Sequence, residues 1–371
     1  MDKAADLLPA LFSGDAAIEC GEDVAVEPEP RQHPEPEAFS NRQLSLFQDV
    51  LCNTDEERRR LSNAIELWDS IPRYSVSRLA MSRLRINDKY LPDHEATFQH
   101  EGRTYAITIS PASIVDVDRQ KREYYPSATE ELVEEALRKM ALQQQQGFFD
   151  KHTFRSGVVF TIYALREELA KLGHSRSHKE IVLALKILSK SVIEIRDTTG
   201  KGEVLASSAY LPALIAVSKR QLAEDPTAKW AAQFHPFVTE SIDRITYRQF
   251  NYHRLMSHDG RLTRWLHKYL VLKFVFADVT KTFRLNYSTV KRDSGLLNEY
   301  ARERDAMDAL QRALNDLQEK EILSKVERIT QTGPKNKILD IRFTLWPSFE
   351  FVKEVKAANK RQLDAQRKIL A

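Results

Sequence analysis

Two helical stripes of apolar residues, separated by a short turn, constrain the fold of this chain more than any other feature. Gly173 follows the first stripe, at the position where a left-handed residue commonly ends a helix. Ser177 and Glu180 then have the spacing of a capping box, which predicts that a second helix begins there. The spacing therefore predicts a helix-turn-helix. The apolar positions of its first helix are Ile162, Leu165, Leu169 and Leu172, and those of its second are Ile181, Ala184, Leu185 and Leu188.

The next segment predicts the hairpin that turns a helix-turn-helix into a winged helix. We expect a strand over residues 191–196, a turn over residues 197–202 and a mostly apolar return over residues 203–217. Helix, turn, helix and hairpin in this order describe a winged helix.

Three further elements are predicted upstream. Residues 57–69 are expected to be a polar helical stretch, and residues 129–142 a helix with one apolar side. Between them, residues 96–109 alternate apolar and polar side chains on both sides of Glu101 and Gly102, which predicts a hairpin.

The same order of elements recurs in the last third of the chain, which predicts a second winged helix. Its long helix over residues 302–320 is the candidate recognition helix. The predicted elements are, in order, a helix that begins near Leu262, a strand over residues 283–287, a brief helix to about Leu297 that Ser288 or Thr289 caps, the long helix, wing strands over residues 322–330 and 338–345, and a basic helix from Pro347.

We therefore expect an α+β protein with two tandem winged-helix domains, preceded by a disordered acidic N-terminal tail. The expected boundaries are residues 1–54 for the tail, 55–235 for the N-terminal winged-helix domain with its preceding hairpin, and 236–371 for the C-terminal winged-helix DNA-binding domain. The tail has eleven acidic residues against three basic ones, a net charge of −8, together with five prolines. High charge and low hydrophobicity predict that it is disordered.

A five-residue peptide in this tail offers three large apolar groups without helical spacing and an amide that could fix their register in a partner's pocket. Its residues are Gln43, Leu44, Ser45, Leu46 and Phe47. They match the QL[SD]LF motif with which bacterial replication proteins hold the sliding clamp of the replicative polymerase. The match predicts a tethered clamp-binding peptide.

The rest of the chain is basic, with a net charge of +11 over residues 55–371. Such a charge favours polyanions, because Lys and Arg release the counterions condensed on phosphates. Recognition helices read bases near their N-termini, so we expect DNA contacts there and on the wings. The candidates are Arg176, Ser177, His178 and Lys179 in the first domain and Lys291, Arg292, Arg302, Arg304, Arg312, Lys335, Lys337 and Arg342 in the second.

The sequence gives little support for an enzyme, and we predict no catalytic residues, cofactor or metal. Gly200-Lys201 lacks the upstream glycine of a phosphate-binding loop, and His174 and His178 straddle a turn without a third ligand nearby. The two cysteines, Cys20 and Cys52, form no framework, and no apolar run is long enough to span a membrane. We expect a cytoplasmic protein without a membrane partner.

Together, the tail peptide, the hairpin, the helix over residues 161–173 and the basic second winged helix resemble plasmid replication initiators built of two winged helices. The resemblance covers residues from about Asn41 to the C-terminus. It implies binding to double-stranded origin DNA at tandem repeats called iterons, and opening of adjacent A+T-rich DNA. It also implies recruitment of the host initiator, the replicative helicase and the sliding clamp, and a homodimer in balance with an active monomer.

Two other functions fit the same pattern. A winged-helix transcriptional repressor without a replication role would bind DNA sequence-specifically but would not bind the clamp. A clamp-associated repair protein or polymerase accessory factor would use the tail but would recognise DNA by its structure.

Overall fold

The computed structural model describes residues 60–115, 119–142, 147–150, 153–199, 203–216, 229–334 and 338–370. The predicted tail, the peptide over residues 43–47, Lys335 and Lys337 lie outside the described residues.

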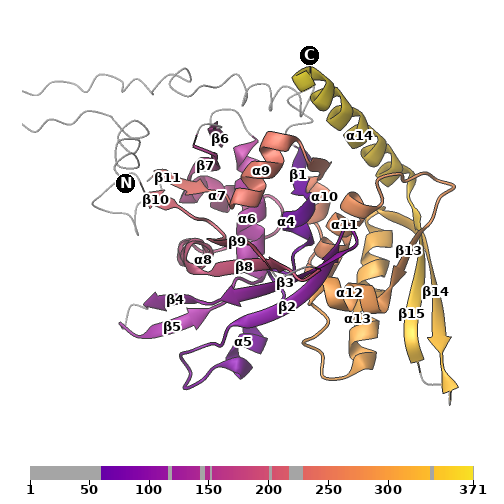
Figure 1. The fold of residues 1–371 in the computed structure, drawn as a ribbon, viewed down its shortest axis with the longest axis horizontal. Helices are drawn as coiled ribbons and strands as arrows, with labels where there is room; N and C mark the ends of the chain where they lie inside the picture. The colour runs from indigo at the N-terminus through magenta and orange to yellow at the C-terminus, as the bar shows by residue number, and fades with distance from the viewer. Residues whose placement is uncertain are drawn as a thin grey trace, which may run out of the picture.

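The first predicted winged helix is confirmed (Figure 1). Its helices are α6 (Ala128–Ala141), α7 (Ile162–Ala170) and α8 (His178–Lys190), and its wing strands are β8 (Val192–Asp197) and β9 (Val204–Ala209). Gly173 has a φ of 84°, as expected where a helix ends in a left-handed residue. Ile162, Leu165 and Leu169 are fully buried, so the apolar stripe faces the core as its spacing predicts.

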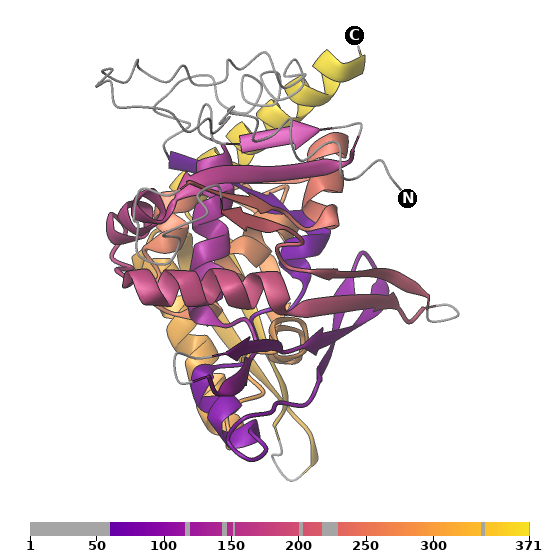
Figure 2. The same ribbon diagram turned by 90° about the vertical axis from the view of Figure 1, so that its left-hand side faces the viewer.

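The predicted hairpin extends this wing into a larger antiparallel sheet. It consists of β2 (His94–His100) and β3 (Arg103–Ser110), which turn at Glu101 and Gly102 with positive φ angles. β3 pairs with β8, so the sheet order is β2-β3-β8-β9. In Figure 2, α8 crosses the middle of the view and leads into the hairpin that projects from the body.

The second winged helix is also confirmed and lies beside the first (Figure 1). In its sheet, β15 lies between β13 and β14. The elements are α11 (Arg261–Lys273), β13 (Phe283–Asn286), α12 (Tyr287–Ser294), the recognition helix α13 (Glu303–Glu319) and the wing strands β14 (Leu323–Thr332) and β15 (Ile338–Pro347).

The remaining elements connect and cover the two winged helices. β10, β11, β7 and β6 form an antiparallel sheet in this order, and β4 pairs with β5. Their bounds are β1 (Leu61–Ile65), α4 (Glu66–Ser70), α5 (Arg78–Leu84), β4 (Ala112–Val115), β5 (Lys121–Tyr124), β6 (Gly147–Asp150), β7 (Arg155–Thr161), β10 (Leu214–Ala216), β11 (Lys229–Gln233), α9 (Pro236–Arg244), β12 (Tyr247–Asn251), α10 (Tyr252–Met256) and α14 (Phe349–Leu370).

Two local predictions are wrong, both because a distant segment supplies the partner. A strand, β1, occupies the middle of the predicted helix over residues 57–69, because it pairs antiparallel with β12 from Leu61 opposite Asn251 to Ile65 opposite Tyr247. α12 begins at Tyr287 after Asn286, so neither Ser288 nor Thr289 is its N-cap. Asp340 of β15 instead accepts hydrogen bonds from the Ser288 amide at 3.1 Å and its hydroxyl at 2.6 Å.

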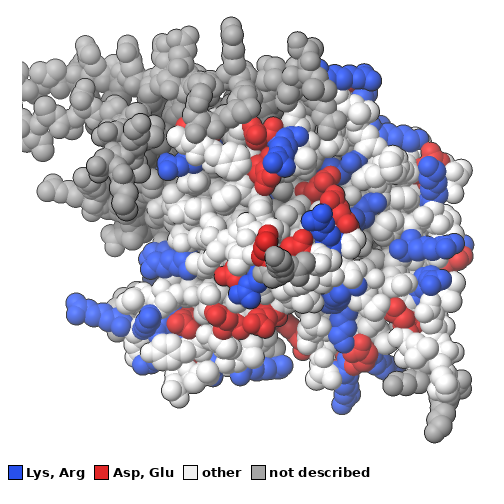
Figure 3. Space-filling model, in the orientation of Figure 1, with Lys and Arg blue, Asp and Glu red and all other residues white. Residues whose placement is uncertain are grey.

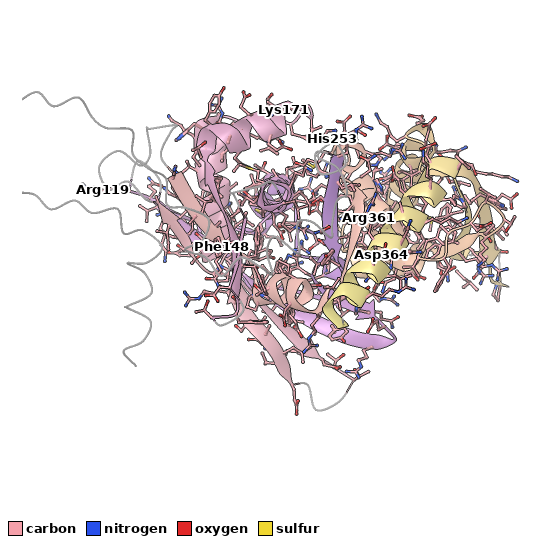
Figure 4. All side chains as sticks on the ribbon, turned by 90° about the horizontal axis from the view of Figure 1, so that it is seen from above. Arg119, Phe148, Lys171, His253, Arg361 and Asp364 are labelled. Atoms are coloured by element: carbon pink, nitrogen blue, oxygen red, sulfur yellow. The ribbon has the colours of Figure 1, made fainter. Side chains whose placement is uncertain are left out.

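One large cluster of buried apolar side chains runs through both winged helices. The final helix, α14, packs back across β12, where Arg361 donates to Gln249 Oε1 at 3.0 Å (Figure 4). The pairing of β1 with β12 also crosses the predicted boundary at residues 235 and 236, which stays a prediction. None of the described helices is both long and apolar enough to cross a membrane.

Candidate nucleic-acid interface

The N-terminus of α8 presents the first group of predicted DNA-binding residues. Ser177 forms the predicted capping box: its hydroxyl accepts from the Glu180 amide at 3.3 Å, and its own amide donates to Glu180 Oε2 at 2.8 Å. Lys179 is exposed, and Arg176 is half-buried against the turn. Because the Ser177 hydroxyl caps α8, Lys179 and Arg176 are the side chains that remain for phosphate contacts at the N-terminus of this helix.

His178 differs from these neighbours. It is half-buried, and its Nε2 is enclosed by protein without a hydrogen-bond partner among the described residues. An enclosed ring nitrogen has no direct path to a base edge, so His178 is the weakest candidate of this group.

The outer face of α13 is open to solvent. Arg302, at the N-cap position, and Arg312 are exposed, and the Arg304 side chain is 90% exposed. The opposite side of the helix is buried, as predicted, through Ala306, Leu310, Ala313, Leu314 and Leu317. The helix therefore holds three arginines toward solvent on a fixed support.

Acidic groups share this face. Asp308 lies 3.9 Å from Arg304 Nε, and Asp305 is exposed one turn earlier. A carboxylate on a recognition helix repels phosphates but can accept a hydrogen bond from cytosine N4. The face therefore combines cations suited to phosphates with carboxylates suited to cytosine N4.

Lys291 and Arg292 lie near the start of α13 but have protein partners. Lys291 Nζ lies 2.7 Å from Glu303 Oε2, and Arg292 Nε lies 2.6 Å from Asp293 Oδ1. The hydrogen bond from Lys291 lowers the pKa of Glu303, so the Glu303 carboxylate is ionised at neutral pH. Both cations lie closer to a carboxylate than Arg304 does, at 2.7 and 2.6 Å against 3.9 Å.

The wing sheet carries further cations, and the sequence predicted only some of them as DNA contacts. Arg342 on β15 lies opposite Asn286, and Arg284 on β13 lies opposite Thr344, which places both arginines on the outer face of the sheet. Arg284 was missed, although it stands between the apolar Phe283 and Leu285 and alternation alone places it outward. Lys325 was also missed; it lies over the Trp346 ring at 4.8 Å.

Figure 3 shows the distribution of charge in the orientation of Figure 1. Lys and Arg side chains gather on its right-hand part, over the second winged helix, with acidic side chains interspersed.

A buried ion cluster joins the two winged helices behind these faces. We call it the interdomain ion cluster; it contains four carboxylates, from Asp69, Glu131, Glu134 and Glu135, and four cations, from Arg73, Arg138, Arg264 and Lys268. Asp69 follows β1, the glutamates lie on α6, and Arg264 and Lys268 lie on α11. The cluster therefore joins α4 and Arg73, which follows it, to the first helix of each winged helix.

Asp69 is at its centre. Arg138 contacts both carboxylate oxygens, at 2.8 and 2.9 Å, and Lys268 Nζ lies 3.2 Å from Oδ1. Burial by itself raises the pKa of Asp69, but Arg138, Lys268 and Arg73 outweigh it and hold the pKa well below its usual range. The carboxylate is thus charged in the folded protein.

Further ion pairs complete the interdomain ion cluster. Arg73 lies 3.0 Å from Glu134, and Arg264 lies 2.9 Å from Glu131 across the two winged helices. Lys268 also pairs with Glu135. Buried ion pairs contribute little net stability, but removal of one partner leaves an uncompensated charge, so a movement that separates these helices would be costly.

One smaller contact also connects the two winged helices, and another lies within the second. The Gln99 amide of β2 donates to Asp293 Oδ1 of α12 at 3.0 Å. Within the second winged helix, His258 connects Asp316 of α13, at 3.1 Å, to His267 of α11, at 3.2 Å. His258 and His267 thus connect α13 to α11.

Comparison with known proteins gives matches among solved structures. No family model and no curated protein matches the chain. It is similar to a crystal structure of selenomethionine derivatives of domains 2 and 3 of RctB, at 13% identity and a TM-score of 0.42, covering 72% of this chain and 98% of that one. It is also similar to a crystal structure of the Pi initiator protein in complex with iteron DNA, at 12% identity and a TM-score of 0.39, covering 60% and 91%.

Proposed function

We propose that this protein is a plasmid replication initiator that binds tandem repeats at an origin through its two winged helices. The observation that carries the proposal is the fixed pair of recognition helices: α8 and α13 belong to winged helices that the buried interdomain ion cluster joins. Two recognition helices held in one relative placement suit a long DNA site whose two halves have a constant spacing.

In this proposal α13 has the main role in the major groove. Its Arg302, Arg304 and Arg312 are exposed, whereas α8 offers Lys179 and Arg176. The outer face of the wing sheet, with Arg284 and Arg342, supplies phosphate contacts beside α13.

Binding of several protomers to neighbouring repeats sums their binding energy, which can distort adjacent A+T-rich DNA. The tail peptide over residues 43–47 would then bring the sliding clamp, and other surfaces would engage the host initiator and helicase. A balance between homodimer and monomer belongs to the same proposal. All of these steps are noncatalytic.

A footprint tests the proposal. The purified full chain is bound to the DNA that flanks its own gene, with scrambled duplex as competitor at a stated salt concentration. We expect periodic protection over direct repeats. Protection of a single promoter site would support a repressor instead, and equal competition by scrambled duplex would refute sequence-specific binding.

A further inference from the structure

A cavity of about 260 Å³ opens where α11 begins, between that end of the helix, the middle of α13 and the loop over residues 296–300. Its polar lining comes from Gly260, Arg261, Thr263, Tyr300 and Arg312. The remainder is lined by leucine and alanine side chains of the same three segments. The lining thus combines apolar side chains with polar and cationic groups.

The N-terminus of α11 faces this cavity without a cap. Gly260 is the N-cap residue and has no side chain, and the first turn contains no acidic residue. The first amides of a helix have no partner within it, and in a 13-residue helix they carry the positive end of the helix dipole. This end of α11 therefore attracts an anion.

The Thr263 side chain gives a second, independent indication of a ligand. Thr263 is only 4% exposed, lines the cavity, and has no hydrogen-bond partner for its hydroxyl among the described residues. The hydroxyl lies beside the open end of the helix, because a Cβ built on Gly260 would be 3.1 Å from Thr263 Oγ1. The hydroxyl can therefore donate to an acceptor oxygen held in the cavity.

The two arginines that line the cavity differ in their contacts with the protein. Arg261 donates to the Tyr74 carbonyl at 2.9 Å and lies 3.7 Å from Glu299, so it is held in place and partly compensated. Arg312 is exposed and forms no ion pair within the part of the chain that the structure describes. Arg312 therefore adds a positive charge without a carboxylate partner among the described residues to the lining of the cavity.

We propose that this cavity is a phosphate-binding site. The phosphate oxygens accept from the free amides of the first turn of α11, from the Thr263 hydroxyl and from the Arg312 guanidinium. The phosphate can belong to the DNA backbone or to a free phosphate compound, since both present the same oxygens. The DNA source rests on the proposed function, whereas the free source does not.

Gly260→Asp is the decisive variant. The backbone at Gly260 is extended, with φ −81° and ψ 132°, so a side chain is tolerated there, and Thr263 has to yield by a few tenths of an ångström. The new carboxylate caps the amides that the phosphate would use, and therefore blocks the site without loss of stability. Thr263→Val removes only the hydroxyl. Ser257→Asp is the matched control, because it adds the same charge at a nearby exposed residue that does not line the cavity.

The first measurement uses no DNA. Thermal unfolding of the full chain is followed with increasing sodium phosphate, against sodium chloride at the same ionic strength. We expect phosphate to raise the Tm of the wild type and of Ser257→Asp. The rise should be smaller in Thr263→Val and absent in Gly260→Asp.

The second measurement identifies the source of the phosphate. Affinity for the footprinted duplex is measured against salt concentration. If the phosphate is that of DNA, Gly260→Asp flattens the plot of log affinity against log salt by about 0.9, the value for one contact, and Ser257→Asp does not. An unchanged slope together with the phosphate-dependent rise in Tm assigns the site to a free phosphate compound.

The proposal is overturned if phosphate stabilises wild type and Gly260→Asp equally, or if neither the Tm nor the salt slope depends on the site. Failure of the proposed function is recognised separately, because it would appear as equal competition by scrambled duplex in the wild type.

Discussion

Arg304 is 90% exposed and its closest acidic neighbour is 3.9 Å away, whereas Lys291 and Arg292 each contact a carboxylate within 3 Å. The sequence predicts all three residues as DNA contacts and does not distinguish between them. Their availability to DNA differs because an existing ion pair must be weakened before its cation can bind a phosphate. At the scale of single residues, the cations of the candidate interface therefore differ in how readily they can bind a phosphate.

Replacement of Arg304 by alanine is predicted to weaken binding to the repeat while the free energy of unfolding stays unchanged. A lost base contact should cost about 1–3 kcal/mol and relax specificity at one position, and a lost phosphate contact should reduce the salt slope by about 1. Arg244→Ala is the control, since Arg244 is an exposed arginine on α9 paired with Glu240. An unaltered footprint and affinity for Arg304→Ala would remove this residue from the interface.

His235 controls a pH response of stability. Burial lowers its pKa to about 3, with a further decrease from Arg73, so His235 is neutral in the folded protein and binds a proton near pH 6.5 only when unfolded. The free energy of unfolding therefore falls as pH decreases from about 6.5, by about 1.4 kcal/mol per unit for this group, until about pH 3. Burial lowers the pKa of His258 and His267 as well, in the same direction.

The variant His235→Asn tests this response. It retains an acceptor for the Phe237 amide, which His235 Nδ1 contacts at 3.2 Å, but does not titrate. Urea unfolding at about pH 6.5 and about pH 5.5 should show a loss that is about 1 kcal/mol smaller in the variant than in the wild type. Equal losses in both proteins would contradict a buried neutral His235.

At the scale of elements, α12 depends on a strand more than fifty residues away in the chain. Asp340 of β15 holds the first turn of α12 through Ser288. Asp340→Ala should therefore lower the free energy of unfolding by about 1 kcal/mol, as loss of an N-cap does, in urea unfolding at neutral pH. Asp243→Ala on α9 serves as a comparison at another helix. A neutral effect of Asp340→Ala would mean that water replaces the carboxylate.

The tail peptide is the element whose role the sequence alone predicts. Ala substitution of Leu46 and Phe47 should weaken binding to the purified sliding clamp at least tenfold, which corresponds to about 1.4 kcal/mol, and leave DNA affinity unchanged. The same substitution of Leu7 and Leu8 removes two apolar side chains outside the motif and should affect neither. Parallel loss of clamp and DNA binding would refute the separation of roles.

At the scale of the whole molecule, the interdomain ion cluster is expected to hold the two winged helices together. Lys268→Met leaves Asp69 and Glu135 without one of their cations and should destabilise the protein by about 3–5 kcal/mol. Lys171→Met, at the exposed end of α7, makes the same chemical change and should be near neutral.

A second substitution separates charge from packing. Adding Glu135→Gln to Lys268→Met removes an uncompensated carboxylate, so the double variant should regain part of the lost stability in urea unfolding. If the double variant is less stable by the sum of both single effects, the two residues act independently and the ion cluster does not couple the winged helices.

Local sequence patterns determine most of the secondary structure. The capping box of α8, the positive φ at Gly173 and the apolar stripes of α7, α11 and α13 depend on residues within a few positions of one another. Period alone also placed Arg302, Arg304 and Arg312 on the exposed side of α13. These features could be predicted because the residues that cause them lie close together in the sequence.

Tertiary structure alone determined β1 and the interdomain ion cluster. β1 is a strand because β12 provides its hydrogen-bond partners, and Lys268 lies 199 residues from Asp69 in the chain. The polar side of α6 looks like a solvated face in the sequence, yet Glu134, Glu135 and Arg138 are buried on it. No local pattern distinguishes a charge that faces water from one that faces a distant opposite charge, because only the fold brings the two together.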